Sequence, residues 1–310
     1  MIYALSLSPC MDRTVTLDRF SLTSVNRVTR LRMDLAGKGI NVARVVETLG
    51  EKCVLVSLDF DQNPVAQGMK REGIPCRAVL TPGEIRINTK YMETATGRMI
   101  EANENSAPVP PAIIEQTKEL LLSLVRPGDW VSLSGSLPTG AALDTYADLC
   151  EKLREKGAFA AVDCDGYPLR SAISKLPALL KPNAHEFFEW TGIDPMQDMD
   201  KALEECRGLV RDGVGRICLS LGEKGAVLIG REGAYGCGIA DVPVRGLQGA
   251  GDSMLGALLV ALSRSMPDEE ALRFSTAAAG ASVMRPGTLL CEREATERLL
   301  PTIRVEKLGW

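Results

Sequence analysis

A glycine-rich turn leads directly into an apolar helical segment at Gly249-Ala250-Gly251-Asp252. The first backbone amides of a helix have no partner inside it and carry part of its positive dipole, so they can hold an anion. Asp252 lies in that first turn, where a carboxylate is stabilised in its ionised form. Amides that neutralise developing charge, beside a carboxylate that accepts a proton, suit phosphoryl transfer to a hydroxyl. Taken alone, the pattern equally describes an ordinary loop with an aspartate near a helix start.

Four further segments combine flexible turns with polar side chains. They are Ala36–Ala43, Ser134–Gly140, Lys181–Glu186 and Ser220–Ala226. In the first, glycines allow a ligand to approach the backbone at a helix start, and Lys38 and Asn41 offer donors to hydroxyls or phosphates. The second follows a predicted strand, where open α/β sheets bind ligands. In the fourth, flanking glycines would let a nucleotide lie against the backbone. A plain turn explains each segment equally well by itself.

The third segment contains an amide and a carboxylate three residues apart, Asn183 and Glu186. On the first turn of a helix they would share a face and could orient Mg²⁺ through its waters. The same spacing also predicts a capping box, in which the two residues satisfy each other's backbone amides. Without further information the capping box is the favoured interpretation. His185, on the same turn, is interpreted as a surface histidine.

Several classes of enzyme are excluded by missing motifs. The chain has no Gly-x-x-x-x-Gly-Lys-Ser/Thr segment, which excludes a P-loop nucleotide site. No Gly-x-Gly-x-x-Gly follows the first strand, which argues against a dinucleotide enzyme. His185 is the single histidine, which removes most Ser-His-Asp triads and histidine-rich metal sites.

The composition is that of an ordinary globular protein of 310 residues, with 45% hydrophobic and 25% charged residues. The net charge of −4 and the lack of a long basic run predict neither a nucleic-acid nor a membrane-surface partner. The nine cysteines form no Cys-x-x-Cys pair and are odd in number, which is typical of free thiols in a reducing compartment. No signal sequence or apolar run of about 20 residues is present, so we expect a cytoplasmic protein.

Strand-like and helix-like segments alternate along most of the chain. Strands are predicted at Ile2–Leu7, Cys53–Leu58, Trp130–Ser134, Ala158–Asp163, Ile217–Leu221 and Ala226–Ile229. Helices are predicted at Gly39–Leu49, Val65–Arg71, Ile113–Val125, Asp144–Leu153, Pro168–Ser174, Ala184–Trp190, Lys201–Arg211, Asp252–Leu262, Glu269–Met284 and Arg293–Leu300. Continuous apolar strands between amphipathic helices indicate an α/β fold with a mainly parallel sheet covered on both faces. Residues 12–35 and 84–104 instead show polar alternation, which predicts a small β-sheet lid or dimer clasp within a single domain, 1–310.

In this order, the five segments resemble those of the PfkB family of ribokinase-like carbohydrate kinases. The resemblance covers essentially the whole chain: Gly-Ala-Gly-Asp matches the C-terminal signature of the family, and Ala-Gly-Lys-Gly-Ile-Asn-Val-Ala matches the N-terminal one. It implies a ribokinase-like fold and ATP-dependent phosphorylation of a sugar, with Mg²⁺. Together with Arg86-Ile87-Asn88-Thr89-Lys90, the segments are most similar to those of kinases of fructose 1-phosphate. Kinases of tagatose 6-phosphate and fructose 6-phosphate are close alternatives, and a non-catalytic sugar-phosphate-binding protein is a more distant one.

The resemblance also implies roles for individual residues. Asp252 would be the base, and the amides of Gly249, Ala250 and Gly251 would hold the transferring phosphoryl group. Sugar hydroxyls would be bound by Asp12, Gly37, Lys38 and Asn41, and the phosphate of the substrate by Arg86, Lys90 and Arg27. Lys181 and Asn183 would contact ATP, Glu186 its Mg²⁺, and Ser220, Gly222 and Gly225 would line the nucleotide site.

The chain departs from the family pattern at three places. Asp59-Phe60-Asp61 stands where relatives have a Gly-Gly pair, and these side chains would crowd or repel an anionic sugar if they faced the pocket. Asn103-Glu104-Asn105-Ser106 replaces Asn-x-Pro-Gly near the end of the lid, and Gln248 replaces an apolar residue before the glycine turn. An exposed small sheet has edges that dimerisation would cover, so we expect a homodimer through the lid.

Overall fold

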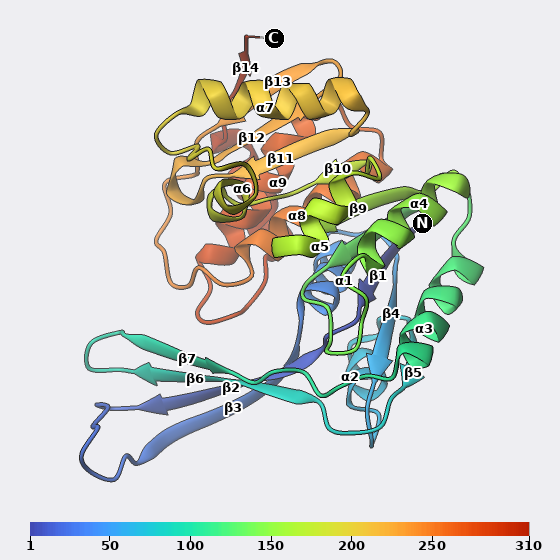
Figure 1. The fold of residues 1–310 in the computed structure, drawn as a ribbon. Coiled ribbons are helices and arrows are strands. Elements are labelled where there is room, and N and C mark those ends of the chain that lie inside the picture. Colours follow the sequence, from blue (N-terminus) through green and yellow to red (C-terminus); the bar gives the residue numbers. More distant parts are fainter. Residues whose placement is uncertain (310) are drawn as a thin grey trace.

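The computed structural model describes residues 1–309, and a sheet of ten strands forms its centre (Figure 1). From one edge to the other the strands are β14 (Val305–Leu308), β13 (Gly233–Cys237), β12 (Ala226–Gly230), β11 (Arg216–Ser220), β10 (Leu179–Leu180), β9 (Phe159–Asp163), β8 (Trp130–Ser134), β1 (Ile2–Ser6), β4 (Cys53–Asp59) and β5 (Cys76–Leu80). The strands from β11 to β5 run parallel, and β12, β13 and β14 continue the sheet antiparallel. The predicted α/β class with a mainly parallel sheet is confirmed.

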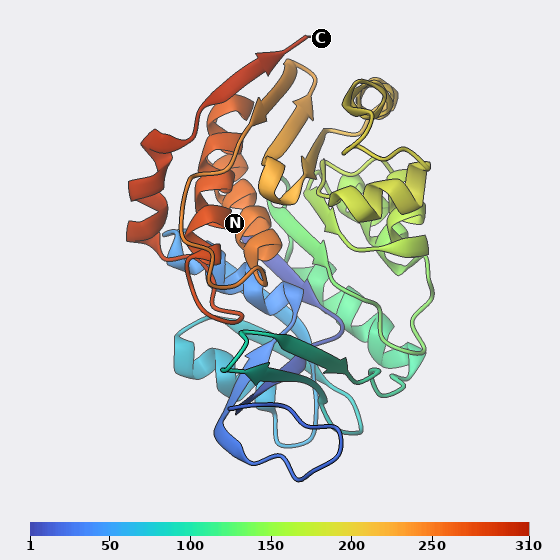
Figure 2. The ribbon, with the colours of Figure 1, turned by 90° about the vertical axis from the view of Figure 1, so that its left-hand side faces the viewer.

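Helices cover both faces of this sheet (Figure 2). One face carries α1 (Lys38–Thr48), α2 (Pro64–Glu72), α8 (Ala250–Ser263), α9 (Asp268–Val283) and α10 (Arg293–Leu299). The other carries α3 (Pro111–Leu124), α4 (Thr145–Glu155), α5 (Gly166–Ile173), α6 (Ala184–Thr191) and α7 (Met199–Asp212). Short 3₁₀ turns lie at η1 (Gly222–Lys224) and η2 (Leu300–Thr302). Side chains alternate between the two cores along each strand, so Ile2 and Ala4 of β1 join one core, and Tyr3 and Leu5 the other.

Two glycines allow the helices nearest the glycine turn to pack closely. A Cβ at Gly256 of α8 would lie 2.5 Å from the side chain of Val45 on α1. A Cβ at Gly39 of α1 would lie 2.3 Å from the carbonyl oxygen of Leu5 on β1. Only a residue without a Cβ permits such approaches. The close packing sets the first turns of α1 and α8 side by side, beyond the carboxyl end of β1.

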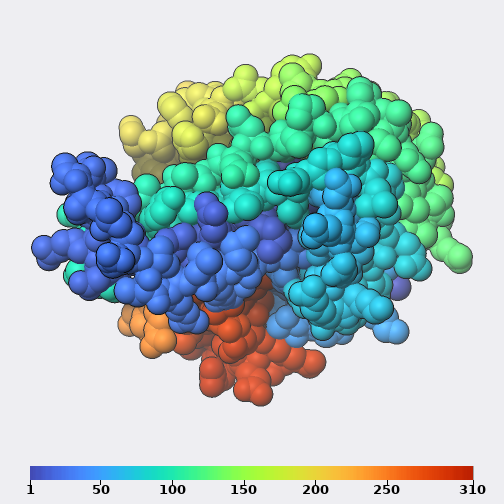
Figure 3. Space-filling view, turned by 90° about the horizontal axis from the view of Figure 1, so that it is seen from below, coloured from blue at the N-terminus to red at the C-terminus, as the bar shows by residue number. Residues whose placement is uncertain are grey.

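A second sheet of four strands projects from the body of the molecule (Figure 1). Its order is β3 (Val28–Ala36), β2 (Cys10–Leu17), β6 (Arg86–Glu93) and β7 (Met99–Asn103). The central pair β2 and β6 is parallel, and the outer pairs are antiparallel. These strands lie almost wholly in the two segments whose alternating polarity predicted an accessory sheet. Seen from below, the residues of β2 and β3 (blue) reach out beyond the body (Figure 3).

Four strands of the large sheet escape prediction from the sequence. β5, β13 and β14 lie toward its edges, and β10 has only two residues. β5 and β14 are half-exposed and carry charged side chains, and β13 contains two glycines, so none has the apolar run of a central strand. Among the residues that the structure describes, none of the helices has the combination of length and apolarity that a membrane span requires.

The unusual Asp59-Phe60 pair has a structural role away from the site. Both side chains are buried, and the Asp59 carboxylate accepts hydrogen bonds from the backbone amides of Phe60, Val65 and Ala66 at 2.9 to 3.0 Å. The last two amides belong to the first turn of α2, so Asp59 caps that helix. The crowding that would follow if these residues faced the pocket does not occur.

We expect Asp59→Ala to destabilise the protein by about 2–4 kcal/mol, because buried amides at the start of α2 lose a charged acceptor. Urea unfolding followed by circular dichroism would measure the change. Asp61→Ala is the matched control, since Asp61 is exposed. Equal unfolding midpoints for the two variants would contradict this account.

Candidate active site

The residues selected from the sequence gather around one pocket of about 1020 Å³. It lies at the carboxyl ends of the parallel strands, between the first turns of α1, α6 and α8 and the small sheet. Every residue to which the family resemblance gave a role lines this pocket, with one exception, whereas no residue of the Ser134–Gly140 segment is among the lining residues. Arg27 is exposed in the loop between β2 and β3, outside the pocket lining.

The turn before α8 leaves backbone amides open toward the pocket. Gly249 has φ +79°, a left-handed conformation, and a Cβ there would meet the side chain of Leu290 at 3.0 Å. The first hydrogen bond of the helix is formed by the Ser253 amide, which donates to the Gly249 carbonyl at 2.8 Å. The amides of Ala250 and Gly251 precede it, at the positive end of the helix dipole. The turn therefore forms a cradle for an anion.

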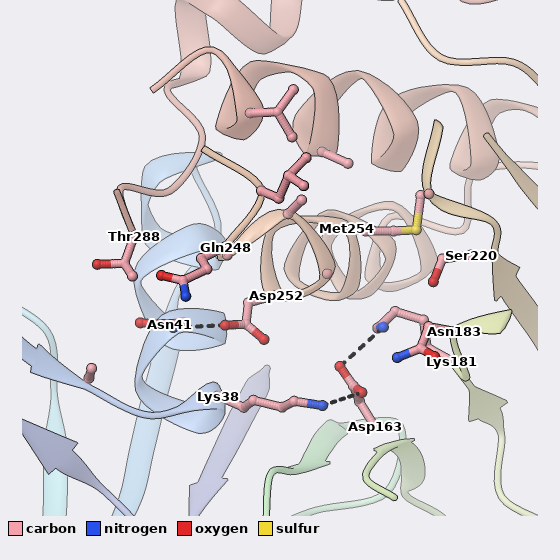
Figure 4. Close-up of a pocket in the computed structure, with 18 of the residues that line it drawn as sticks. Lys38, Asn41, Asp163, Lys181, Asn183, Ser220, Gln248, Asp252, Met254 and Thr288 are labelled. Carbon is pink, nitrogen blue, oxygen red and sulfur yellow. Dashed lines mark hydrogen bonds and ion pairs between the residues drawn. The ribbon is translucent and has the colours of Figure 1, made fainter. Parts of the chain in front are cut away.

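Asp252 is buried beside this cradle, and Asn41 holds its carboxylate in place (Figure 4). The Asn41 side-chain amide donates a hydrogen bond to Asp252 Oδ2 at 2.7 Å. Burial raises the pKa of Asp252 above its ordinary value, and the positive charge of Lys38 offsets only part of this effect. A carboxylate with a raised pKa is better suited to take up a proton near neutral pH.

A buried carboxylate that the sequence analysis did not select, Asp163, joins two lysines (Figure 4). Its oxygens lie 2.9 Å from Lys38 Nζ and 3.2 Å from Lys181 Nζ. Burial would raise the pKa of Asp163, but Lys181 and Lys38 lower it below its ordinary value. Its position in the sequence could have indicated a role, because Asp163 is the last residue of the apolar strand β9, and ligands bind at the carboxyl ends of such strands.

The two lysines bring positive charge to the cradle. Lys181 Nζ lies 3.6 Å from the point that a Cβ at Gly251 would occupy, so the glycine keeps open the space beside this cation. Burial by itself lowers the pKa of Lys38, but Asp163, Asp252 and Glu186 together raise it above its ordinary value. Lys38 therefore stays charged at all physiological pH values.

The predicted capping box is present at the start of α6. Asn183 Oδ1 accepts from the Glu186 amide at 2.9 Å, and Glu186 Oε2 accepts from the Asn183 amide at 2.8 Å. Both residues still line the pocket, and Glu186 Oε1 lies 3.9 Å from Lys38 Nζ. Burial and the charge of Asp163 raise the pKa of Glu186. His185, on the same turn, is exposed, as its surface interpretation predicts.

The far end of the pocket combines glycine turns with exposed apolar side chains. Ser220, Gly222 and Gly225 lie where β11 ends and β12 begins. A Cβ at Gly225 would lie 1.9 Å from the Cys237 carbonyl oxygen, so this turn requires glycine. The apolar side chains there, which the sequence analysis did not select, are Ile239, Val244 and Leu247. Such a surface suits the flat, apolar faces of a nucleotide base.

One face of the small sheet closes the opposite end of the pocket. The strand register aligns Asp12 with Asn88, and Asn88 with Asn103, and all three line the pocket. Arg86 and Lys90 lie on the same face of β6. Gln248, before the glycine turn, donates a hydrogen bond to Glu101 of β7, so the polar replacement joins the two sides of the pocket.

Comparison with known proteins assigns this arrangement to a family. The model of the pfkB family carbohydrate kinases matches residues 5–295. The chain is 31% identical to 1-phosphofructokinase of Rhodobacter capsulatus over 311 positions, covering 99% of the chain and 98% of that protein. It is 28% identical to 1-phosphofructokinase of Bacillus subtilis over 310 positions, covering 99% and 100% respectively.

The fold comparison agrees. Phosphofructokinase-2 from Escherichia coli, solved in complex with potassium, superposes with a TM-score of 0.92 at 26% identity, over 97% of this chain and 98% of that one. The same enzyme has been solved in complex with fructose-6-phosphate. The chain belongs to the pfkB family of carbohydrate kinases.

Proposed function

We propose that this kinase transfers the γ-phosphoryl group of ATP to the 6-hydroxyl of fructose 1-phosphate, giving fructose 1,6-bisphosphate. The observation that carries the proposal is the buried Asp252 beside the amide cradle at the start of α8. The substrate assignment is supported by the relatives named 1-phosphofructokinase, which match over nearly their whole length. It is also supported by the basic side chain of Arg86 in the sugar end of the pocket, since a phosphorylated sugar needs a cation that a free sugar does not.

In the proposed reaction, Asp252 accepts the proton of the attacking hydroxyl while Asn41 keeps the carboxylate in position. The amides of Gly249, Ala250 and Gly251 stabilise the charge that develops on the transferring phosphoryl group. Lys181, next to Gly251, adds positive charge to the same region. Proton transfer and charge stabilisation are then provided by one turn of helix, so the reacting atoms need little reorganisation.

ATP is the proposed donor, and its glycine-lined site is at Ser220, Gly222 and Gly225. We propose that a Mg²⁺ ion accompanies the nucleotide. Within residues 1–309 no group of three or more metal-binding side chains is present, but Asp163 and Glu186 both approach Lys38 Nζ. One or two carboxylates, with waters and phosphate oxygens, are the ligands that Mg²⁺ takes in nucleotide sites. The bound ion would neutralise phosphate charge and orient the nucleotide.

Asp252→Asn is expected to lower kcat by about 10²–10⁴-fold with little change in sugar affinity, because the amide keeps the shape but cannot accept the proton. A coupled assay of ADP release with fructose 1-phosphate measures kcat, and calorimetry measures sugar binding. Asp212→Asn, on the exposed end of α7, is the matched control. Near wild-type turnover by Asp252→Asn would remove this residue from the mechanism.

The same assay with a panel of sugars tests the substrate. We expect fructose 1-phosphate to give the highest kcat/KM among fructose 1-phosphate, fructose 6-phosphate, tagatose 6-phosphate and fructose. A higher value for either of the other two phosphates would contradict the assignment. Binding of the sugar phosphate without any turnover would instead identify a non-catalytic binding protein.

The acid side of the pH profile reports the state of Asp252. Because the base must be ionised, kcat/KM should fall as the pH drops through the pKa of Asp252, which lies above the ordinary 3.8. The hydrogen bond from Asn41 lowers this pKa, so Asn41→Ala should move the acid limb to higher pH. Asn105→Ala, at an exposed position, is the control. A limb that stays in place in Asn41→Ala would show that another group controls it.

We infer further that the enzyme forms a homodimer through the outer face of the small sheet. The register aligns Leu31, Val15, Tyr91 and Ile100 across all four strands, on the face opposite Asp12. Leu31 and Ile100, on the two edge strands, are 59% and 51% exposed, and Val15 between them is 7% exposed. A row of apolar side chains on an exposed sheet is typical of a surface that a second chain covers.

Leu31→Asp is expected to convert the dimer to a monomer, because it places a charge in this apolar row, at the exposed end formed by β3. Sedimentation velocity at micromolar concentration would measure the oligomeric state. Leu143→Asp is the matched control, since Leu143 is 58% exposed but lies outside the small sheet. A wild-type protein that sediments as a monomer, or a Leu31→Asp variant that remains dimeric, would contradict the proposed interface.

A further inference from the structure

The two basic residues of β6 that face the sugar end of the pocket are in different electrostatic states. Lys90 Nζ lies 2.6 Å from Asp12 Oδ2, and both side chains are only 7% exposed. Arg86, four residues earlier on the same face, forms no comparable pair. Among the side chains of residues 1–309, no carboxylate lies within ion-pair distance of its guanidinium group. Resemblance to the family gave these two residues one shared role, and the geometry separates them.

Lys90 occupies one oxygen of Asp12 and leaves the other available. Asp12 Oδ1 accepts only distant donors, Asn88 Nδ2 at 3.3 Å and Cys10 Sγ at 3.8 Å. Burial, followed by the charge of Asp12, raises the pKa of the Cys10 thiol to about 12, so this neighbour stays neutral. A sugar hydroxyl that donates to Oδ1 at ordinary distance would form a stronger bond than either donor.

Arg86 is held by weak contacts and keeps its charge uncompensated. Its guanidinium nitrogens donate to Asn88 Oδ1 and the Glu104 carbonyl at 3.3 Å, and to the Ser8 carbonyl at 3.4 Å. Its Nε atom is buried and has no hydrogen-bond partner in the described part of the chain. Because guanidinium binds phosphate through several donors at once, Arg86 can exchange these contacts for a phosphate group.

We propose that Lys90 is a positioning residue that fixes Asp12 as the acceptor of a sugar hydroxyl, and that Arg86 alone of the two recognises the phosphate already on the substrate. The proposal rests on the proposed function and divides its sugar site into two parts. A cation offset by a buried carboxylate at 2.6 Å attracts a phosphate only weakly, and leaving that carboxylate for the phosphate would strand a buried charge. Arg86 has no carboxylate partner, so its charge is not offset and binding a phosphate breaks no ion pair.

The test compares kcat/KM for fructose 1-phosphate and for fructose, which differ only in the phosphate. We expect Lys90→Met to lower both values by a similar factor of about 10², as expected when a hydrogen-bonded charge pair at a hydroxyl is broken. Arg86→Gln should lower the value for fructose 1-phosphate by about 10²-fold and that for fructose by less than threefold. Arg77→Gln, exposed on β5, is the control. A loss in Lys90→Met confined to fructose 1-phosphate would overturn the proposal.

A second measurement needs no substrate and therefore separates this proposal from the proposed function. Urea unfolding of Asp12→Asn, Lys90→Met and the double variant gives the coupling between the two side chains. We expect the double variant to be at least as stable as Lys90→Met, because its remaining partner carries no unpaired charge. Additive losses would overturn the pairing. If Lys90→Met does not fold, the kinetic comparison uses Asp12→Asn and the double variant. We expect kcat/KM to fall by the same factor for fructose 1-phosphate and for fructose. A fall confined to fructose 1-phosphate would contradict the proposal.

Discussion

The site depends on one buried carboxylate, Asp163, which holds two lysines that come from distant parts of the chain. Lys38 begins α1 and Lys181 follows β10, and Asp163 at the end of β9 lies within 3.2 Å of both ammonium groups. Without Asp163 the two positive charges would repel each other with no carboxylate between them. With it, both ammonium groups are held in ion pairs near the glycine turn of α8. The ion pairs of Asp163 therefore connect residues that are far apart in sequence, next to that turn.

The same network explains why the carboxylates of the pocket differ. Asp163, Asp252 and Glu186 share two lysines, and Asp163 has the closest contacts with both. Its pKa is lowered, whereas burial raises the pKa of Asp252 and of Glu186 with incomplete compensation. Environments that push carboxylate pKa values apart assign different tasks to chemically identical groups. All three carboxylates line the same pocket, and only Asp163 forms ion pairs with both lysines.

Residue types and spacing predicted most of this molecule, because the central strands and amphipathic helices bury apolar side chains with clear periodicity. The glycine turns also led to the pocket residues around them, such as Lys38 and Asp252, whereas Asp12, Arg86 and Lys90 were selected through the resemblance to the family. Asp163 was missed because one acid after an apolar strand is common, and its importance comes from two lysines far away in sequence. The edge strand β14 was missed because its charged residues are compatible with a loop. Long-range pairing, rather than local pattern, decides such cases.

Departures from a family pattern acquire meaning only from the surroundings of each side chain. Asp59 and Phe60 replace two glycines with bulk and charge, yet they face the core, where Asp59 caps α2. Gln248 stands where the family pattern has an apolar side chain, and it lines the pocket and joins the glycine turn to Glu101 on the small sheet. The change at Asp59 thus alters the capping of α2, and the change at Gln248 alters how the two walls of the pocket are connected.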